Sequence, residues 1–380
     1  MKKQMLSVLA VLCVLSMLCL TAFAAPYSSE TGKVAEWLGN PENTQFDYEE
    51  TSFVDNLIDW TAFSLARTGK SGPAEYVDYI NAAVANSFDK MYPSDLARTV
   101  LAVTANGMDA KNIGGHDLLA ALARVDYSSQ IYLSSLNTPL LAMNFKADFP
   151  FEASLKNGIV EAILSVQQPD GGWAYCSVDQ GYGVYSDADS TSMTVQALAP
   201  YYAENEAVGR AVDKALAYLQ AQIGATGALE AWGAPSGEST AQFVLALCEL
   251  GIDPTGSAYT NNGKTLLDGV KSFITENGGA RNYQGAEDPL TTYQVLLALN
   301  AANRYAENRE SVFTYVEKTE EPTTPEPTVP SVPENATTTD SASQTVEIPK
   351  TGSAVTVAGA FAAMLCAGAV LALCKKETDA

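Results

Sequence analysis

Histidine is nearly absent from this sequence, which limits the chemistry that the chain can carry. The 380 residues include one histidine, His116 in "GGHDLL". A Ser-His-Asp triad needs a histidine base, and zinc sites draw mainly on histidine and cysteine ligands. His116 opens a predicted helix, so we interpret it as a surface or capping residue. The sequence predicts no metal site and no cofactor.

Cysteine is scarce in the part of the chain that can fold. Of six cysteines, two lie in an apolar run near the N-terminus and two in another near the C-terminus, which leaves Cys176 and Cys248 between them. These two form either one disulfide or two free buried thiols, and their spacing does not decide between the alternatives.

Positive charge is also limited. The chain has 22 Lys and Arg against 44 Asp and Glu, for a net charge of -22. A strongly acidic surface repels phosphate backbones, so nucleic acid is not an expected partner. Hydrophobic residues make up 47% of the chain, a proportion typical of a folded protein with a core.

The N-terminus has the features of a secretory signal peptide. Lys2 and Lys3 precede the apolar run "MLSVLAVLCVLSMLCLTAFA". Residues 22–24, Ala-Phe-Ala, give the small-x-small pattern that signal peptidase needs. We therefore predict a signal peptide over residues 1–24 and secretion of the chain.

The C-terminus combines a short motif, an apolar segment and a basic tail. Residues 353–374 are uncharged and long enough to span a bilayer, and two lysines follow them. The preceding motif consists of Ile348, Pro349, Lys350, Thr351 and Gly352.

Residues 348–380 resemble the cell-wall sorting signal of Gram-positive surface proteins. The resemblance implies that a sortase processes the chain at the Thr351 carbonyl and attaches it to peptidoglycan. Residues 353–374 would then be inserted in the membrane only transiently. We expect a secreted, wall-anchored surface protein.

Between these ends, the composition divides the chain into a domain and a stalk. Residues 319–347 are rich in proline, threonine and acidic residues and have few large apolar ones. Such a segment cannot bury a core and is expected to be extended. Residues 25–318 are expected to form the folded domain.

A helical theme recurs along this domain. An acidic or polar residue, followed by small residues, opens a run rich in Ala, Leu and Val. The copies start at Asp59, Asp95, Asn137, Asp189, Glu238 and Asp288. Their spacing lies in the range of helical-pair repeats.

More amphipathic helices are predicted between these runs. Their apolar residues recur every three or four positions, within residues 74–88, 117–125, 155–168, 207–222 and 263–279. Alternation of buried and half-exposed helices indicates two concentric layers. Strand signals are scarce, so the predicted class is all-α.

One junction carries a family resemblance. "LSVQQPDGGWAY" resembles the Q-x-x-G-x-W repeat of terpene cyclases, through Gln168, Gly171 and Trp173, and "YLQAQIGATGALEAW" is a weaker copy. The chain resembles the prenyltransferase and squalene-oxidase repeat superfamily. The resemblance implies an (α/α)6 toroid over residues 50–315, in which Gln168 and Trp173 brace helix junctions.

Within this superfamily, the acid motif of class II cyclases suggests a catalytic alternative. Mapped onto "DADS", Asp189 would be the general acid and Asp187 its hydrogen-bond partner, but Ser190 replaces the last acid. A helix cap or another structural role is the favoured interpretation, because acids also open the runs at Asp59, Asp95, Glu238 and Asp288, and every helix needs its first amides capped. A calcium site with Asp179 is a third interpretation. The zinc ligands of protein prenyltransferases and the Cys-Gly-Glu-Gln run of complement thioesters are missing.

The sequence favours ligand binding without catalysis. We expect the mouth where the first set of helices starts to bind a small hydrophobic or corrin-like molecule, a surface protein or a glycan. The aromatic residues expected to contribute are Trp60, Trp173, Tyr185, Trp232 and Tyr283. The alternative is a degenerate class II cyclase or prenyltransferase-like enzyme that uses Asp189.

Overall fold

The computed structural model describes residues 26–181, 183–231 and 233–316. All of them lie in the first of two units, Met1–Lys318. The predicted signal peptide, stalk, sorting motif and membrane segment lie outside the described residues, as does Trp232. No helix in the described part of the chain combines the length and the apolar character that a membrane crossing requires.

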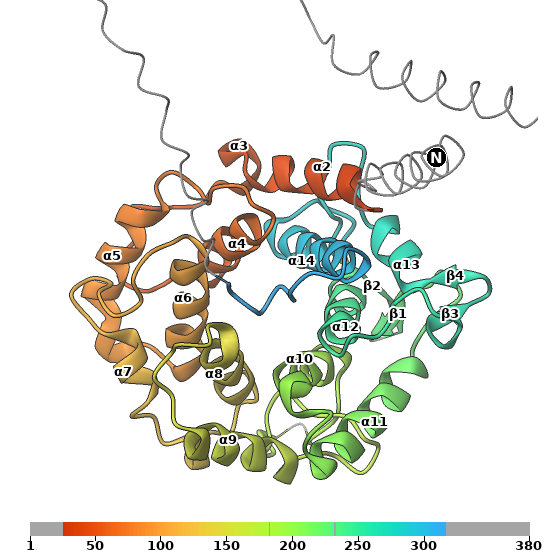
Figure 1. Ribbon diagram of the computed structural model, residues 1–380. Helices are drawn as coiled ribbons and strands as arrows, with labels where there is room; N and C mark the ends of the chain where they lie inside the picture. The colour runs from red at the N-terminus through yellow and green to blue at the C-terminus, as the bar shows by residue number, and fades with distance from the viewer. Residues whose placement is uncertain (1–25, 182, 232, 317–380) are drawn as a thin grey trace, which may run out of the picture. The chain divides into compact units, whose positions relative to one another are not determined.

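Six of the described helices surround the centre of the domain, in the arrangement that Figure 1 shows. Each contacts its neighbours on both sides, and the last contacts the first, so the described helices close a ring. These inner helices are α4 (Asn56–Arg67), α6 (Pro93–Ala105), α8 (Ser134–Phe145), α10 (Ala188–Leu198), α12 (Gly237–Glu249) and α14 (Pro289–Ala306).

A second layer of helices surrounds the inner ring (Figure 1). It consists of α2 (Ser28–Leu38), α5 (Tyr76–Ser87), α7 (Leu118–Leu122), α9 (Ala153–Ser165), α11 (Glu206–Gln220) and α13 (Leu266–Ser272), together with the short α3 (Pro41–Thr44). Single 3-10 turns lie in the connections, at η1 (Phe88–Lys90), η2 (Tyr127–Ser129), η3 (Ala199–Tyr201) and η4 (Ser257–Tyr259). Outer and inner helices alternate along the chain, so every inner helix begins at the same face, which we call the N-terminal mouth.

Two small antiparallel hairpins complete the described structure. Strands β1 (Leu229–Ala231) and β2 (Ala234–Ser236) pair with Leu229 opposite Ser236. Strands β3 (Thr260–Asn261) and β4 (Lys264–Thr265) pair with Thr260 opposite Thr265. They lead into α12 and α13, and the rest of the regular structure described is helical.

The mostly helical, two-layered ring confirms the predicted class. All six inner helices lie where the repeated runs predicted them, and each starts within three residues of the expected position. The repeated pattern does not predict α2, α3 or the two hairpins. Helix α2 matters because it packs against α14 and α4 and helps to close the ring.

The first and last helices are joined by one asparagine. The Asn303 side chain on α14 accepts a hydrogen bond from the Tyr27 amide and donates one to the Thr31 hydroxyl, both at 2.9 Å. Trp37 of α2 also donates from Nε1 to Glu287 at 3.1 Å. These bonds fix α2, the first described helix, against α14 and the loop that precedes it.

A repeated threonine attaches three loops to the inner helices that follow them. Thr191, Thr240 and Thr292 lie at the fourth position of α10, α12 and α14. Each hydroxyl accepts a hydrogen bond at 2.9 Å from a backbone amide of the preceding loop, donated by Trp173, Leu229 and Ala280 respectively. The recurring small polar residues of the sequence pattern therefore serve to connect loop and helix.

The junction at Trp173 has the bracing role that the resemblance implied. The indole is fully buried and donates from Nε1 to the Ile163 carbonyl at 2.9 Å. Its neighbour Gln167, which the motif does not include, donates from Nε2 to both the Gly171 and Ala211 carbonyls at 2.8 Å. Gln168 instead donates to the local Val166 carbonyl, so Gln167 is the residue that reaches the next outer helix.

Residues 307–316 cross the ring at the end opposite to the N-terminal mouth (Figure 1). We call this segment the C-terminal strap. Arg67 at the end of α4 donates to the carbonyls of Ser311, Val312 and Thr314, at 3.2, 2.8 and 2.7 Å. The Tyr315 amide donates to the Phe145 carbonyl at 2.7 Å, so the strap is bound to two inner helices.

Candidate functional site

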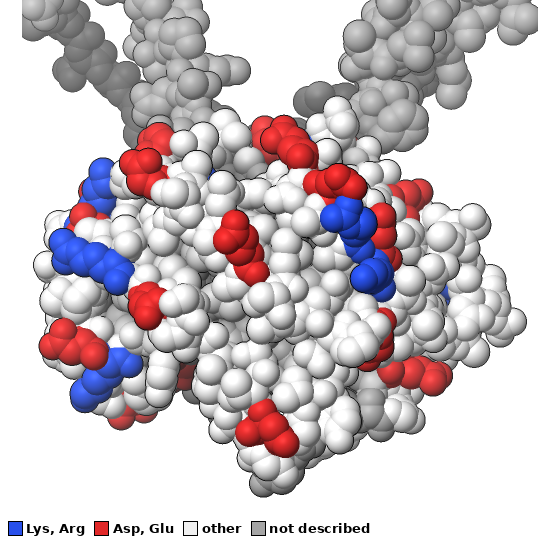
Figure 2. All heavy atoms as spheres, turned by 90° about the horizontal axis from the view of Figure 1, so that it is seen from below, with Lys and Arg blue, Asp and Glu red and all other residues white. Residues whose placement is uncertain are grey.

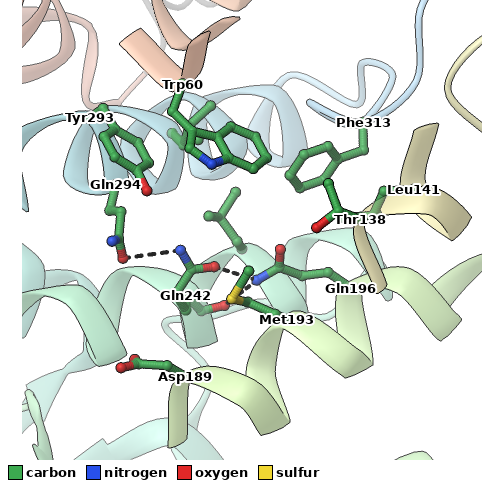
Figure 3. Close-up of a pocket in the computed structure, with 12 residues that line it drawn as sticks. Trp60, Thr138, Leu141, Asp189, Met193, Gln196, Gln242, Tyr293, Gln294 and Phe313 are labelled. Carbon is green, nitrogen blue, oxygen red and sulfur yellow. Dashed lines mark hydrogen bonds between the residues drawn. The ribbon is translucent and has the colours of Figure 1, made fainter. Parts of the chain in front are cut away.

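A cavity of about 120 Å³ lies at the centre of the inner ring. It reaches from Asp189, in the first turn of α10, to Phe313 of the C-terminal strap. Figure 3 shows Trp60, Tyr293 and Phe313 on one side of it and Met193, Gln196 and Gln242 on the other. The lining residues are Trp60, Thr138, Leu141, Asp189, Met193, Gln196, Gln242, Leu245, Tyr293, Gln294, Leu297 and Phe313.

The acids that open the inner helices do not have a common role. Asp288 caps α14 by accepting from the Thr291 amide, and the Asp95 side chain accepts from the Tyr92 amide at 3.0 Å. Asp59 is fully buried in an ion pair with Arg98 at 3.3 Å. Glu238 accepts from the Thr291 hydroxyl and so links α12 to α14. The prediction that these acids form a set of equivalent helix caps is therefore wrong.

Asp187 and Asp189 also differ from each other. Asp187 is the N-cap of α10 and accepts from the Ser190 amide at 2.7 Å. Asp189 lies two positions into the helix, and its buried Oδ1 has no hydrogen-bond partner. The cap of α10 is thus Asp187, and the interpretation of Asp189 as the cap is wrong. Asp189 is the one acid among the residues that line this cavity.

The surroundings of Asp189 favour its protonated form. Burial, together with a smaller effect of the nearby carboxylates of Asp187 and Glu238, raises the pKa of Asp189 to about 6. The Ser239 hydroxyl opposes this shift, although it does not reach hydrogen-bonding geometry with Oδ1. The cavity therefore contains a carboxyl group that changes charge near neutral pH.

Three glutamines form a hydrogen-bonded row along the cavity. Gln196 donates to the side chain of Gln242 at 2.8 Å, and Gln242 donates to that of Gln294 at 3.0 Å (Figure 3). The row crosses α10, α12 and α14 and fixes the orientation of each amide. The sequence analysis missed these residues.

A repeated signal for the glutamine row is present in the sequence. The tripeptides "TVQ", "TAQ" and "TYQ" end at Gln196, Gln242 and Gln294 and lie in three successive inner helices. Because inner helices point equivalent positions toward the centre, a polar residue repeated in this way predicts a shared polar wall.

The aromatic residues proposed from the sequence separate into three groups. Trp60 lines the cavity, with its ring stacked on that of Tyr293 at a centroid distance of 6.1 Å. Trp173 is in the core and does not line the cavity. Tyr185 and Tyr283 are 73% and 86% exposed, in loops that precede α10 and α14.

Other exposed aromatic residues accompany them at the N-terminal mouth. Tyr92 immediately precedes α6, Tyr132 precedes α8, and Phe53 precedes α4, all as exposed side chains. Tyr132 packs against the exposed Tyr175 with ring centroids 5.4 Å apart. The loops at this mouth therefore present aromatic rings to solvent from several repeats.

On one flank of the ring, charged residues are mixed. Figure 2 shows acidic and basic side chains interspersed there, separated by broad uncharged areas. This flank has no patch of one sign that would attract a polyelectrolyte. The carboxylates beside the cavity, those of Asp187, Asp189 and Glu238, are therefore of interest because they lie close together, and not because the surface as a whole is crowded with acids.

The two cysteines left open by the sequence are both free thiols. Burial raises the pKa of Cys248 well above the ordinary value for a thiol, which favours an unreactive group. For the calcium interpretation, Asp179 accepts from the amides of Gly181 and Gly183 in its own loop. Across the described residues, no group of three or more His, Cys, Asp or Glu is arranged to hold a metal ion.

Comparison with solved structures supports the fold. A polysaccharide lyase matches 74% of this chain and 99% of its own at a TM-score of 0.50 and 10% identity. The unsaturated glucuronyl hydrolase from Bacillus sp. GL1 matches 71% of this chain and 94% of its own, at 0.50 and 13%. The fold is an α/α toroid. At these identities the likeness extends to the fold alone.

A type II terpene cyclase, MstE from Scytonema, is also similar, over 74% of this chain and 98% of its own. Its TM-score of 0.48 and identity of 12% are too low to bear on activity. No family model matches the chain, and no curated protein matches it. The toroid is compatible with enzymes of several kinds, so function has to be argued from the site.

Proposed function

We propose that this toroid is a non-catalytic binding domain that takes a small ligand into its central cavity. The observation that carries the proposal is the cavity itself, which has aromatic and amide walls and Asp189 among its lining residues. Pockets of this composition are typical of ligand sites, where a few polar groups orient a ligand in mostly apolar surroundings. Because the C-terminal strap covers the other end, the ligand would enter at the N-terminal mouth.

The size of the cavity restricts the ligand. An engineered cavity of about 150 Å³ binds benzene, whereas pockets for drug-sized ligands are about 300–1,000 Å³. At about 120 Å³, the cavity suits a molecule close to benzene in size. A corrin or a polyprenyl chain would require Phe313 or the facing aromatic residues to move. The size of the cavity therefore argues against a corrin-like ligand and against the prenyl substrate of the enzyme alternative.

A specific observation keeps the cyclase alternative open. Asp189 is a buried acid in an aromatic cavity, with a pKa of about 6, and a general acid needs such a shifted group. However, Asp187 is occupied as the N-cap of α10, and Ser190 stands in place of the last acid. Incubation of the purified chain with prenyl substrates, followed by product analysis, tests this alternative. Products that are abolished in Asp189→Asn would favour the enzyme over the binding domain.

The binding proposal is tested with a cavity-filling variant. Leu297 lines the cavity, and Leu297→Phe would fill part of it. Its neighbour Leu296 is fully buried and does not line the cavity, so Leu296→Phe is a matched control. Saturation-transfer NMR of the purified full chain with a panel of benzene-sized amines, acids, alcohols and arenes should give saturable binding that Leu297→Phe abolishes. Absence of any saturable binding, or binding that Leu297→Phe leaves unchanged, would contradict the proposal.

We further propose that the domain is displayed on the cell surface, attached to peptidoglycan by a sortase. Support comes from the sequence of residues 1–24 and 348–380. In a Gram-positive host with an active sortase, Thr351→Ala should shift the protein from the cell-wall fraction to the membrane fraction. Wall linkage that survives this substitution would exclude Ile348–Gly352 as the sorting motif.

A further inference from the structure

The carboxylates beside the cavity have no positively charged partner within the described residues. Asp187 and Glu238 are close enough to raise the pKa of Asp189, and no lysine or arginine is among the groups that act on it. Arg98 is a cation that acts on Tyr293, which lines the cavity. Arg98 already pairs with Asp59 and Asp95, at 3.3 and 3.0 Å. The Asp189 end of the cavity is thus electrostatically negative.

Aromatic side chains form the wall beside this negative end. Trp60 and Tyr293 lie nearly parallel, with an interplanar angle of 10°. Phe313, which belongs to the C-terminal strap, continues this wall. The thioether of Met193 lies on the other side of the cavity (Figure 3). Electron-rich ring faces attract organic cations, and tryptophan does so most strongly. The cavity thus combines an aromatic wall with an unpaired negative group.

We propose that the ligand is a small organic cation of the alkylammonium class, with its charged head between the aromatic wall and Asp189. This inference rests on the proposed binding function and specifies its ligand. An anion would meet the three carboxylates, and a neutral molecule would leave Asp189 without a counter-charge. Tetramethylammonium and the head group of choline are close to benzene in size, which agrees with the cavity of about 120 Å³.

Choline and its neutral carbon isostere, 3,3-dimethyl-1-butanol, provide a direct test because they differ in charge and hardly in shape. In titration calorimetry of the purified full chain at pH 7.5 and low salt, choline should bind about tenfold or more tightly than the alcohol. Asp189→Asn should remove most of this difference by weakening choline alone. Glu161→Gln, at an exposed position on the outer helix α9, changes the net charge equally and should leave both affinities unaltered.

The pH dependence gives a second readout. Choline affinity should rise between pH 5 and 7.5 as Asp189 loses its proton, and this rise should be absent in Asp189→Asn. The ionisable groups that act on Asp189 are Asp187, the N-cap of α10, and Glu238 on α12. Asp189 also acts on Tyr293 of α14, which is affected in addition by Asp288, the N-cap of α14, and by Arg98 on α6. A rise that persists in Asp189→Asn would assign the effect to one of these groups and overturn the role of Asp189.

The outcomes separate this inference from the proposed function. If the alcohol binds as tightly as choline, or the preference for choline survives in Asp189→Asn, the cavity binds ligands but the cation inference is wrong. If neither compound binds and the wider panel also gives no saturable binding, the proposed function itself fails. Binding of both compounds that Leu297→Phe does not affect would locate them outside the cavity and would also contradict the inference.

Discussion

The same inner helices form both ends of the ring, but the strap covers one end and the other end is open. At the strap end, the guanidinium groups of Arg67 and Arg304 donate to five backbone carbonyls of the strap and of α4. At the N-terminal mouth, aromatic side chains are exposed, and Asp189 has a buried oxygen without a partner. The strap end is held by these bonds, although Oε1 of Glu249 there also has no partner, whereas the mouth is the end that presents aromatic rings to solvent.

The ends of helices explain this difference. The last carbonyls of a helix lack intrahelical partners and attract cations, and the first amides lack partners and attract anions. Arginines therefore suit the strap end. At the other end Asp55, Asp187, Ser236 and Asp288 cap four inner helices, and any further acid, such as Asp189, is free for another role.

The strongest test of the closed end is Arg67→Ala. The substitution removes three hydrogen bonds to the strap and the contacts of the guanidinium with the rings of Phe145 and Tyr315. Because buried carbonyls would be left unsatisfied, we expect a loss of about 3–4 kcal/mol in the free energy of unfolding. Denaturant titration measures it. Arg281→Ala, at an exposed position, is the control, and an equal loss there would show that the strap contacts are not the cause.

The two ends should also differ in the pH range over which they affect stability. Burial raises the pKa of Asp189 from 3.8 to about 6 and that of Glu249, beside the strap, from 4.5 to about 7. An unfolded chain releases these protons at lower pH than the folded one. Each group therefore stabilises the fold at low pH, and its contribution is lost as the pH rises through the folded pKa.

At pH 8, removal of either charge should raise the free energy of unfolding. We expect a gain of up to about 2–3 kcal/mol for Asp189→Asn or Glu249→Gln and little change at pH 4. Thermal melts across this range should show the Asp189 effect developing at lower pH than the Glu249 effect. A gain of equal size in Glu161→Gln would mean that reduced net charge, and not burial, is responsible.

A smaller effect is expected at the loop junctions of the open end. Thr240→Val removes a hydroxyl that accepts from the Leu229 amide and donates to the Ser236 carbonyl. The free energy of unfolding should fall by about 1–2 kcal/mol. Thr292→Val should have a similar effect because its hydroxyl makes the equivalent bonds. If the exposed Thr226→Val matched them in chemical denaturation, the junction bonds would not be what stabilises this end.

The smallest effect is expected for the exposed rings. Tyr185→Ala and Tyr283→Ala should each change the free energy of unfolding by less than about 0.5 kcal/mol, because these side chains are 73% and 86% exposed. Trp173→Phe is the contrast, since it removes a buried indole and its bond to Ile163. A destabilisation by Tyr185→Ala as large as that by Trp173→Phe would show that the mouth is packed instead of open.

Much of the fold could be predicted because the repeated pattern has a local cause. Each inner helix needs a polar start and a nearly all-apolar body, and both requirements are visible in the sequence at all six starts. Helix α2 was not predicted, since its role depends on contacts with α14, more than 250 residues later in the chain. The strap was missed for the same reason, because its carbonyls are bound by Arg67, over 240 residues earlier.

The site was harder to predict than the fold because similar residues have different neighbours. Asp59, Asp189 and Glu238 all begin apolar helices, but only Asp59 faces an arginine. Asp59 forms an ion pair, Glu238 links two helices, and Asp189 lines the cavity. Which of these roles an acid takes depends on the adjacent helices and on its exact position in the first turn. Trp60 and Trp173 illustrate the same point, since the sequence alone does not reveal which one faces the centre.

The bonds between Asn303, Tyr27 and Thr31 have a consequence for the order of the chain. In a row of stacked repeats the outermost units have one neighbour each and need special capping surfaces. Here the described helices form a circle with no outermost unit, because α2 and α14, the first and last of them, are bonded to each other. New termini could therefore be opened in a different exposed loop if a linker joined the end of the strap to α2, and such a permuted chain would retain every contact between adjacent helices.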